Sequence, residues 1–235
     1  MKSLCIGDIH DQVDLVQAIL GKYEKDFDEV VFVGDFFDSF GGGKKEAEKT
    51  AHWLKESLTH PNRKHIWGNH CMHYKFFRNN QIKGSGYSRS KADAINKIMK
   101  WEDWNKLLFF YETQGFVISH AGIGEHLAHP IKGVDLKMIK SACYEDYNNA
   151  LNEGVASSVF RVGTARGGEY GKGGITWLDW SKLEPISGLS QIVGHSHHDT
   201  IRYKNYNGSI NVNIDCLPKY LLSIEDGKLQ EIKLT

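Results

Sequence analysis

Residues 3–10 read SLCIGDIH and residues 29–38 read EVVFVGDFFD, and these two segments decide the fold. Each begins with an apolar run that suits a buried strand and then reaches Gly-Asp. A third segment, RKHIWGNH at 63–70, reaches Gly-Asn-His in the same way. Apolar residues at helical spacing follow the first segment over 13–23 and the second over 46–58. This repeat of strand, loop and helix predicts parallel strands with covering helices, whose carboxyl ends share one edge.

The rest of the chain changes from helices to strands. Residues 90–107 are predicted as one helix that packs Trp101 and Trp104 inward, and 134–151 as another. Alternating or short apolar runs predict strands at 109–113, 116–119, 191–193, 201–203, 210–214, 220–224 and 228–233. A parallel beginning and an antiparallel end predict an α/β fold, a two-sheet β-sandwich of mixed strands flanked by helices. Without a linker or an internal repeat, residues 1–235 are expected to form one domain, with about 76–115 and 124–175 as candidate cap or insert segments.

The composition indicates which binding partners and which cellular compartment to expect. Lys+Arg and Asp+Glu each number 29, so no general attraction to nucleic acid or to an anionic membrane is expected. No apolar run approaches the roughly 18 residues that span a bilayer, and the first run is too short for a signal peptide. The four cysteines (Cys5, Cys71, Cys143 and Cys216) lie far apart, which favours reduced thiols over a disulfide frame. We therefore expect a soluble, cytoplasmic protein.

Five short motifs carry side chains that suit metal ions: GDIH at 7–10, GDFFD at 34–38, GNH at 68–70, SHAG at 119–122 and GHSH at 194–197. Carboxylates combined with imidazoles suit first-row divalent metals, whereas carboxylates alone would suit calcium or magnesium. The candidate ligands are Asp8, His10, Asp35, Asn69, His120, His195 and His197. Taken singly, an Asp after Gly is commonly a turn former, but five motifs in order favour a metal site. The histidines without ligand spacing are interpreted as structural; they are His52, His60, His65, His73, His126 and His129.

These ligands divide between two neighbouring ions. One ion would take Asp8, His10, Asp35 and His197, and the other Asp35, Asn69, His120 and His195, with the two oxygens of Asp35 bridging them. Two ions about 3.5–4 Å apart can clamp the attacking and leaving oxygens of an in-line displacement at phosphorus. A water shared by the ions would lose its proton near neutral pH and attack phosphorus. The chain is therefore predicted to be a binuclear phosphoesterase; Mn²⁺ is the expected metal, and Fe, Zn²⁺, Co²⁺ and Ni²⁺ accept the same ligands.

In this order the motifs resemble those of the calcineurin-like metallophosphoesterase superfamily. Its pattern is D-x-H, G-D-x-x-D, G-N-H followed by an acid, a lone His, and G-H-x-H, and the match spans nearly the whole chain. The resemblance implies the sandwich architecture and the ligand division given above. It also implies that His70 protonates the leaving-group oxygen and that Asp38 orients His70. A carboxylate beside an imidazole fixes its tautomer and raises its pKa.

Within the superfamily, SHAGI at 119–123 and TWLDW at 176–180 resemble the branch of Ser/Thr protein phosphatases and bacterial diadenosine-tetraphosphate hydrolases. The protein phosphatases grip the substrate phosphate with arginines where this chain has Ser39 and Trp67, and Cys71 replaces the acid after G-N-H. Arg161 and Arg166, beside the glycine-rich stretch 163–174, are the candidate phosphate-binding residues. An ordinary solvated loop is the alternative for that stretch.

Three functions remain open. A phosphomonoesterase that acts on phosphorylated protein or on a small phosphorylated molecule is favoured by the two branch motifs. A phosphodiesterase or dinucleoside-polyphosphate hydrolase that acts on nucleotides is favoured by the missing arginines, because such a substrate brings less charge to bind. A non-catalytic scaffold is disfavoured, because every expected ligand and His70 are present.

Overall fold

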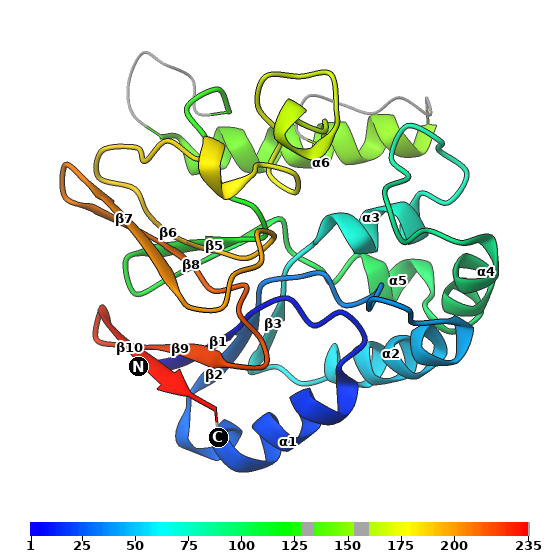
Figure 1. The fold of residues 1–235 in the computed structure, drawn as a ribbon, viewed down its shortest axis with the longest axis horizontal. Helices are drawn as coiled ribbons and strands as arrows, with labels where there is room; N and C mark the ends of the chain where they lie inside the picture. The colour runs from blue at the N-terminus through cyan, green and yellow to red at the C-terminus, as the bar shows by residue number, and fades with distance from the viewer. Residues whose placement is uncertain (128–133, 153–159, 235) are drawn as a thin grey trace.

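The computed structural model describes residues 1–127, 134–152 and 160–234, which fold around two five-stranded β-sheets (Figure 1). The first sheet has the order β10 (Lys228–Lys233), β9 (Tyr220–Glu225), β1 (Lys2–Ile6), β2 (Glu29–Phe32) and β3 (Arg63–His65). The second has the order β4 (Phe110–Thr113), β5 (Phe116–Ser119), β6 (Ser190–Val193), β8 (Ser209–Asn213) and β7 (Arg202–Tyr206). The strands β1-β2-β3 and β5-β6-β8 run parallel, and the outer pairs are antiparallel. The predicted two-sheet sandwich of mixed strands is confirmed.

Apolar side chains from both sheets meet in one buried cluster. Cys5 and Val31 of the first sheet belong to it together with Ile118, Ile192 and Val212 of the second. Successive side chains of a strand point to opposite faces, so the neighbouring residues of β1 and β2 face the helices instead. Both faces of these central strands are therefore buried, which explains their continuous apolar sequence.

Helices cover the sandwich on its outer sides (Figure 1). The helices α1 (Val13–Tyr23) and α2 (Lys44–Ser57) each bury one apolar side in the same core cluster as β1 and β2. The others are α3 (Asn69–Lys75), α4 (Arg89–Ile98), α5 (Trp101–Trp104) and α6 (Leu136–Asn152), with 3-10 turns η1 (Glu24–Asp26), η2 (Thr164–Arg166) and η3 (Trp180–Lys182). Because α1 and α3 begin shortly after β1 and β3, the loops between them lie at the carboxyl ends of these strands.

The predicted single helix over 90–107 is wrong, because the chain forms α4 and α5 instead. Met99 has an extended backbone with ψ of 121°, which ends α4. The carboxylate of Asp103 accepts the backbone N–H of Lys100 at 2.9 Å and thereby caps α5. The break leaves Trp104 buried but Trp101 49% exposed, so only one of the two tryptophans packs inward as expected. Apolar spacing alone could not reveal this, since both residues suit one helical face.

The predicted cap segments contain most of the remaining helices. The segment 76–115 includes α4 and α5, and 124–175 includes α6. Residues 128–133 and 153–159 of the second segment lie outside the described residues. Their role as caps, and the assignment of the chain to one domain, stay predictions. Among the described residues, no helix combines the length and hydrophobicity that crossing a membrane requires.

A buried histidine under α2 makes the fold sensitive to acid. His65 is 2% exposed, lies 2.8 Å through Nε2 from the hydroxyl of Ser57 and stacks on Phe32. Burial, assisted by the charge of Arg63, lowers the pKa of His65 to about 3 from 6.5. The unfolded chain therefore binds one more proton than the folded chain between these values, so stability is complete above pH 6.5 and falls as the pH is lowered.

We expect His65 to account for about 2 kcal/mol of the loss in unfolding free energy between pH 7.5 and pH 5.0. Urea denaturation of the wild type and of His65→Gln at both pH values measures this loss. The variant should lose correspondingly less, whereas His60→Gln, at an exposed position, should behave as the wild type. An equal loss in His65→Gln would contradict the assignment.

Candidate metal centre

The predicted ligands lie where the carboxyl ends of parallel strands from both sheets meet. Asp8 follows β1 and Asp35 follows β2, whereas His120 follows β5 and His195 follows β6. The backbone N–H of His195 donates to both carboxylate oxygens of Asp8, at 3.2 and 3.0 Å, although 187 residues separate the two. The carbonyl of His120 accepts the N–H of Gly194 at 2.7 Å. The bonds between His195 and Asp8 join the second sheet to the first at the site, and the bond between Gly194 and His120 ties the ends of β5 and β6 together within the second sheet.

The ligand atoms form two groups that share Asp35. In the first group, Asp8, His10 and Asp35 offer atoms within 4.8 Å of one another. Nε2 of His10 lies 3.9 Å from Oδ2 of Asp8 and 4.0 Å from Oδ2 of Asp35. In the second group, Asp35, His120 and His195 are equally close, and Nε2 of His120 lies 3.2 Å from Oδ2 of Asp35. The shared carboxylate is positioned to bridge two ions.

The side-chain amide of Asn69 completes the second group. One of its two terminal amide atoms faces His120 and lies 2.9 Å from Nε2 of that imidazole. The same position is 2.9 Å from Nδ1 of His195 and 3.2 Å from Oδ2 of Asp35. Ligands bound at about 2.0–2.2 Å to one ion lie about 3 Å from each other, so the four side chains have the spacing of a single ligand set.

Close contacts between loops explain two of the motif glycines. A Cβ on Gly68 would lie 2.1 Å from Oδ1 of Asp35, and a Cβ on Gly194 would lie 2.0 Å from Oδ1 of Asp8. In each case the glycine of one motif leaves the space that the carboxylate of another motif occupies. The motifs therefore fit together as one unit, and any larger residue at either position would displace a ligand.

Three of the candidate ligand residues have a left-handed backbone, which residues with a side chain adopt only where their surroundings enforce it. The φ angles are 43° at His10, 42° at Asp35 and 64° at His195. The carbonyl of Asp35 accepts the N–H groups of Ile9 at 3.1 Å and of His10 at 2.8 Å. The first two motifs thus hold each other in this conformation, which fixes the positions of the candidate ligands His10 and Asp35.

Backbone carbonyls orient two of the imidazoles. Nδ1 of His10 lies 2.9 Å from the carbonyl oxygen of Phe37, and Nδ1 of His120 lies 3.0 Å from that of Val33. Each carbonyl can accept an Nδ1–H from the ring, which leaves Nε2 as the ring nitrogen beside the carboxylates. A neutral imidazole with a free nitrogen is the form that binds a metal ion. The residues present fit divalent ions on this ground.

Burial and like charge dominate the electrostatics of the site. Burial raises the pKa of Asp8 well above its usual range, and the nearby carboxylates of Asp215 and Asp35 raise it further. Burial also opposes ionisation of Asp35, but the imidazole of His120 outweighs it and the pKa of Asp35 is well below its usual range. Burial lowers the pKa of the His195 imidazole, which keeps that ring neutral. Cations between these groups would relieve the repulsion among the carboxylates.

His197 and Asp215 lie beside the first ligand group. His197 belongs to neither group: its side chain is 65% exposed, and its Nδ1 is 3.3 Å from Oδ1 of Asp215. Asp215 is buried and follows β8, the third parallel strand of the second sheet. The charge of its carboxylate raises the pKa of Asp8. His197 stays a predicted ligand, and Asp215 is an additional candidate.

A second polar cluster surrounds Asp38, whose carboxylate is buried among four donors. It accepts from Nδ1 of His70 at 2.9 Å, from Nε2 of His73 at 2.7 Å, from Nζ of Lys91 at 2.9 Å and from the hydroxyl of Tyr74. Asp38, His70 and His73 have the spacing of a metal site. The ammonium of Lys91, however, already supplies the positive charge that this carboxylate needs, so we interpret the cluster as a support for His70.

Comparison with known proteins identifies the family. A family model of calcineurin-like phosphoesterases matches residues 1–204. The chain belongs to the calcineurin-like phosphoesterases. This family is binuclear and metal-dependent, and the two groups that share Asp35 supply the Asp and His residues that such a centre requires.

Solved structures agree with this phosphoesterase in fold. A cold-active protein-tyrosine phosphatase of a psychrophilic Shewanella species matches with a TM-score of 0.59 and 15% identity, over 99% of this chain and 80% of that one. A protein serine/threonine phosphatase from Saccharomyces cerevisiae matches with a TM-score of 0.55 and 13% identity, over 100% of this chain and 80% of that one. At such identities the likeness concerns the fold alone. No curated protein matches the sequence.

The two candidate phosphate-binding arginines of this phosphoesterase have different surroundings. Nη2 of Arg166 donates to the carbonyl of the candidate ligand His195 at 2.9 Å, and its Nε lies 2.8 Å from Oδ2 of Asp179. Nε of Arg161 donates to the carbonyl of Lys172 at 3.2 Å, and its guanidinium lies over the ring of Tyr170. Arg166 is thus beside the metal centre, whereas Arg161 supports the glycine-rich stretch. A contact of either residue with phosphate stays a prediction.

Sequence reasoning missed several residues of the site. Asp215 comes shortly after a strand, as the other candidate carboxylates do, and that position could have identified it. His73 was set aside as structural because it lacks ligand spacing. Lys91 and Tyr74 give no local signal; Lys91 lies on a helix 53 residues away from Asp38 in the sequence.

Removal of the shared carboxylate should prevent stable metal binding in this phosphoesterase. Saturating Mn²⁺ added to metal-stripped protein should raise its unfolding free energy by about 3 kcal/mol at 100 times the dissociation constant. Asp35→Asn should lose most of this gain, because both ligand groups contain Asp35. Thermal unfolding with and without Mn²⁺ measures the gain, with Asp14→Asn, an exposed carboxylate paired to Lys49, as control. A full gain in Asp35→Asn would contradict the shared-ligand assignment.

Proposed function

We propose that this phosphoesterase hydrolyses phosphomonoesters at a centre of two divalent metal ions, held by Asp8, His10, Asp35 and His197 and by Asp35, Asn69, His120 and His195. The observation that carries the proposal is the sharing of Asp35 by two groups of ligand atoms. When bound, the two ions would acidify a water molecule and neutralise the phosphate. Mn²⁺ is the proposed metal, because the mixed nitrogen and oxygen ligands suit a first-row divalent ion.

His70 is the proposed proton donor to the leaving-group oxygen. Asp38 engages Nδ1 of His70 at 2.9 Å, which leaves Nε2 as the nitrogen that can transfer a proton. Burial alone would lower the pKa of His70, but the carboxylates of Asp35 and Asp38 outweigh it, and the net effect is a raised pKa. The ring therefore stays protonated at a higher pH than an ordinary histidine and can act as a general acid.

Lys91, His73 and Tyr74 are proposed to hold Asp38 in position. The backbone N–H of Gly84 donates to Nδ1 of His73 at 3.4 Å, so the neutral ring gives its Nε2–H to Asp38. Lys91 is 7% exposed, and its ammonium compensates the buried charge of Asp38. With both oxygens of Asp38 engaged, the carboxylate has little freedom to turn away from His70.

A phosphodiester or a nucleotide anhydride is the second candidate substrate. The observation that favours it concerns the two positions at which the protein phosphatases have arginine. Trp67 is buried and stacks on Trp104, and the backbone and hydroxyl of Ser39 are bonded to Asp11 at 2.9 and 3.1 Å. Neither position offers a cation, and Arg166 is partly neutralised by Asp179. A substrate with less charge needs fewer cations.

Two further parts of the proposal concern the cellular location and the substrate partners. We propose a cytoplasmic protein, in support of which the four cysteines are unpaired and buried. The proposed substrate partners are a phosphorylated protein, a small phosphorylated molecule or a nucleotide. A non-catalytic scaffold is the least favoured function, because a scaffold does not need the strained ligand backbone or the protonated His70.

Hydrolysis of p-nitrophenyl phosphate and of bis-p-nitrophenyl phosphate by the Mn²⁺-loaded protein tests the proposed function. We expect the monoester to have the higher kcat/KM, and Arg166→Met to reduce that value. A preference for the diester would replace the first candidate with the second. Absence of Mn²⁺-dependent turnover on both substrates would contradict a catalytic function.

Loss of the proton donor should matter most for poor leaving groups. We expect His70→Ala to lower kcat on phenyl phosphate by about 10²–10⁴-fold, the range typical of general acids, and to affect p-nitrophenyl phosphate much less. Steady-state kinetics at saturating Mn²⁺ measure both values, and the metal content of the variant must equal that of the wild type. Equal losses on the two substrates would contradict the role of His70.

Lys91→Met should show a weaker form of the same pattern. Because Lys91 acts through Asp38, we expect about a tenfold decrease in kcat on phenyl phosphate and an unchanged KM. Lys97→Met, an exposed lysine on the same helix, is the matched control and should have wild-type kinetics. An unchanged ratio between the two substrates in Lys91→Met would show that Lys91 has a structural role only.

A further inference from the structure

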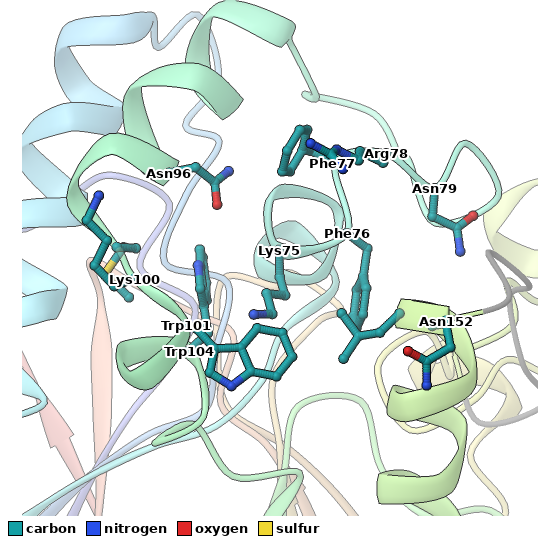
Figure 2. Close-up of a pocket in the computed structure, with 13 residues that line it drawn as sticks. Lys75, Phe76, Phe77, Arg78, Asn79, Asn96, Lys100, Trp101, Trp104 and Asn152 are labelled. Carbon is teal, nitrogen blue, oxygen red and sulfur yellow. The ribbon is translucent and has the colours of Figure 1, made fainter.

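A cavity of about 660 Å³ lies at the carboxyl end of α3 (Figure 2). Its walls come from the end of α3 and the segment after it, from α4 and α5, and from the end of α6. The volume is within the range of small-molecule sites in proteins. The helix α3 has seven residues: Asn69 is its first residue and Lys75 its last. The cavity is thus at the end of α3 opposite to the candidate metal ligand.

The charges of this cavity are all positive. Its described lining residues include Lys75, Arg78 and Lys100 but no Asp or Glu. Nζ of Lys75 lies 3.5 Å from the ring centre of Trp101 (Figure 2), the guanidinium of Arg78 lies over the ring of Phe77, and Lys100 donates to a backbone carbonyl. Burial lowers the pKa of Lys75 to about 8, and the nearby charge of Glu102 offsets only part of this effect. Three cations without an acidic neighbour in the lining favour an anionic ligand.

The walls of the cavity are aromatic and contain unused donors. Trp101 is 49% exposed, although an indole of this size is usually covered. Phe76 and Trp104 form buried parts of the wall. Nδ2 of Asn79 and Nε1 of Trp104 are buried without an acceptor among the described residues, and Asn79 is only 7% exposed. A flat ring with acceptor atoms would cover Trp101 and could satisfy such donors.

We propose that this cavity is a second ligand site, for a small anion with a planar ring, of the nucleoside monophosphate class. The phosphate would lie beside the ammonium of Lys75, and the base would stack on the exposed part of Trp101, as bases commonly do on exposed aromatic side chains. The cavity does not include the ligand groups around Asp35, so this ligand is not the phosphoester that is hydrolysed. The proposal therefore does not depend on the proposed function.

Titration calorimetry of the Mn²⁺-loaded protein tests the second site. The probe is the methylenephosphonate analogue of adenosine monophosphate, in which CH₂ replaces the ester oxygen, so that it cannot be hydrolysed as a phosphate ester. We expect a binding event that persists after removal of Mn²⁺. Adenosine alone and methylphosphonate alone, which carry the two halves of the probe, should each bind at least tenfold more weakly.

Lys75→Met and Trp101→Ala should each weaken this event at least tenfold, and both positions are partly exposed, so the fold should tolerate the changes. Lys140→Met, an exposed lysine on α6 that does not line the cavity, should bind as the wild type. Binding that is unaffected by Lys75→Met and Trp101→Ala, or that disappears entirely on removal of Mn²⁺, would overturn the proposal. Hydrolysis of p-nitrophenyl phosphate by both variants should stay within twofold of the wild type, which keeps this test separate from that of the metal centre.

Discussion

The buried carboxylates of Asp8 and Asp35 impose the constraint on which the rest of the site depends. Each is 2% exposed, and they offer oxygens to one ligand group at the edge where the two sheets meet. Two like charges in such an interior are unfavourable unless donors or cations compensate them. The backbone N–H of His195 donates to Asp8, the N–H of His70 donates to Asp35 at 2.9 Å, and imidazoles lie beside both. Metal ions would supply the remaining positive charge, and the Nε2 atoms of His10 and His120 already lie beside the carboxylates.

This constraint explains features of the backbone that would otherwise be costly. The left-handed conformations of His10, Asp35 and His195 are held by hydrogen bonds between motifs far apart in the sequence. Gly68 and Gly194 leave room for carboxylates that come from other strands. The sandwich therefore serves as a rigid frame: two parallel sets of strands, β1-β2-β3 and β5-β6-β8, bring their loops to one edge, and the loops lock together there.

The short helix α3 joins three parts of the molecule. Its first turn carries Asn69 and His70, and its middle supplies His73 and Tyr74 to the cluster around Asp38. Its last residue, Lys75, lines the aromatic cavity. One end of α3 therefore lies at the candidate metal centre and the other at the cavity. Lys91 of helix α4 donates to Asp38, the residue to which His73 and Tyr74 of α3 also donate.

The sequence by itself determined the strand-and-helix order, the sandwich of mixed strands and the types of ligand at the strand ends. These properties depend on local patterns: apolar periodicity located the 13–23 helix at its observed bounds, and Gly followed by Asp, Asn or His marked where strands end. Only the tertiary structure decided that Met99 divides the predicted helix, that Asp215 joins the carboxylates, that Lys91 reaches Asp38 and that Trp101 stays exposed beside a cavity. The physical reason is that these contacts join residues distant in the sequence. Local periodicity does not specify which distant side chain fills the space beside a glycine. It also does not specify which side chain compensates a charge that folding buries.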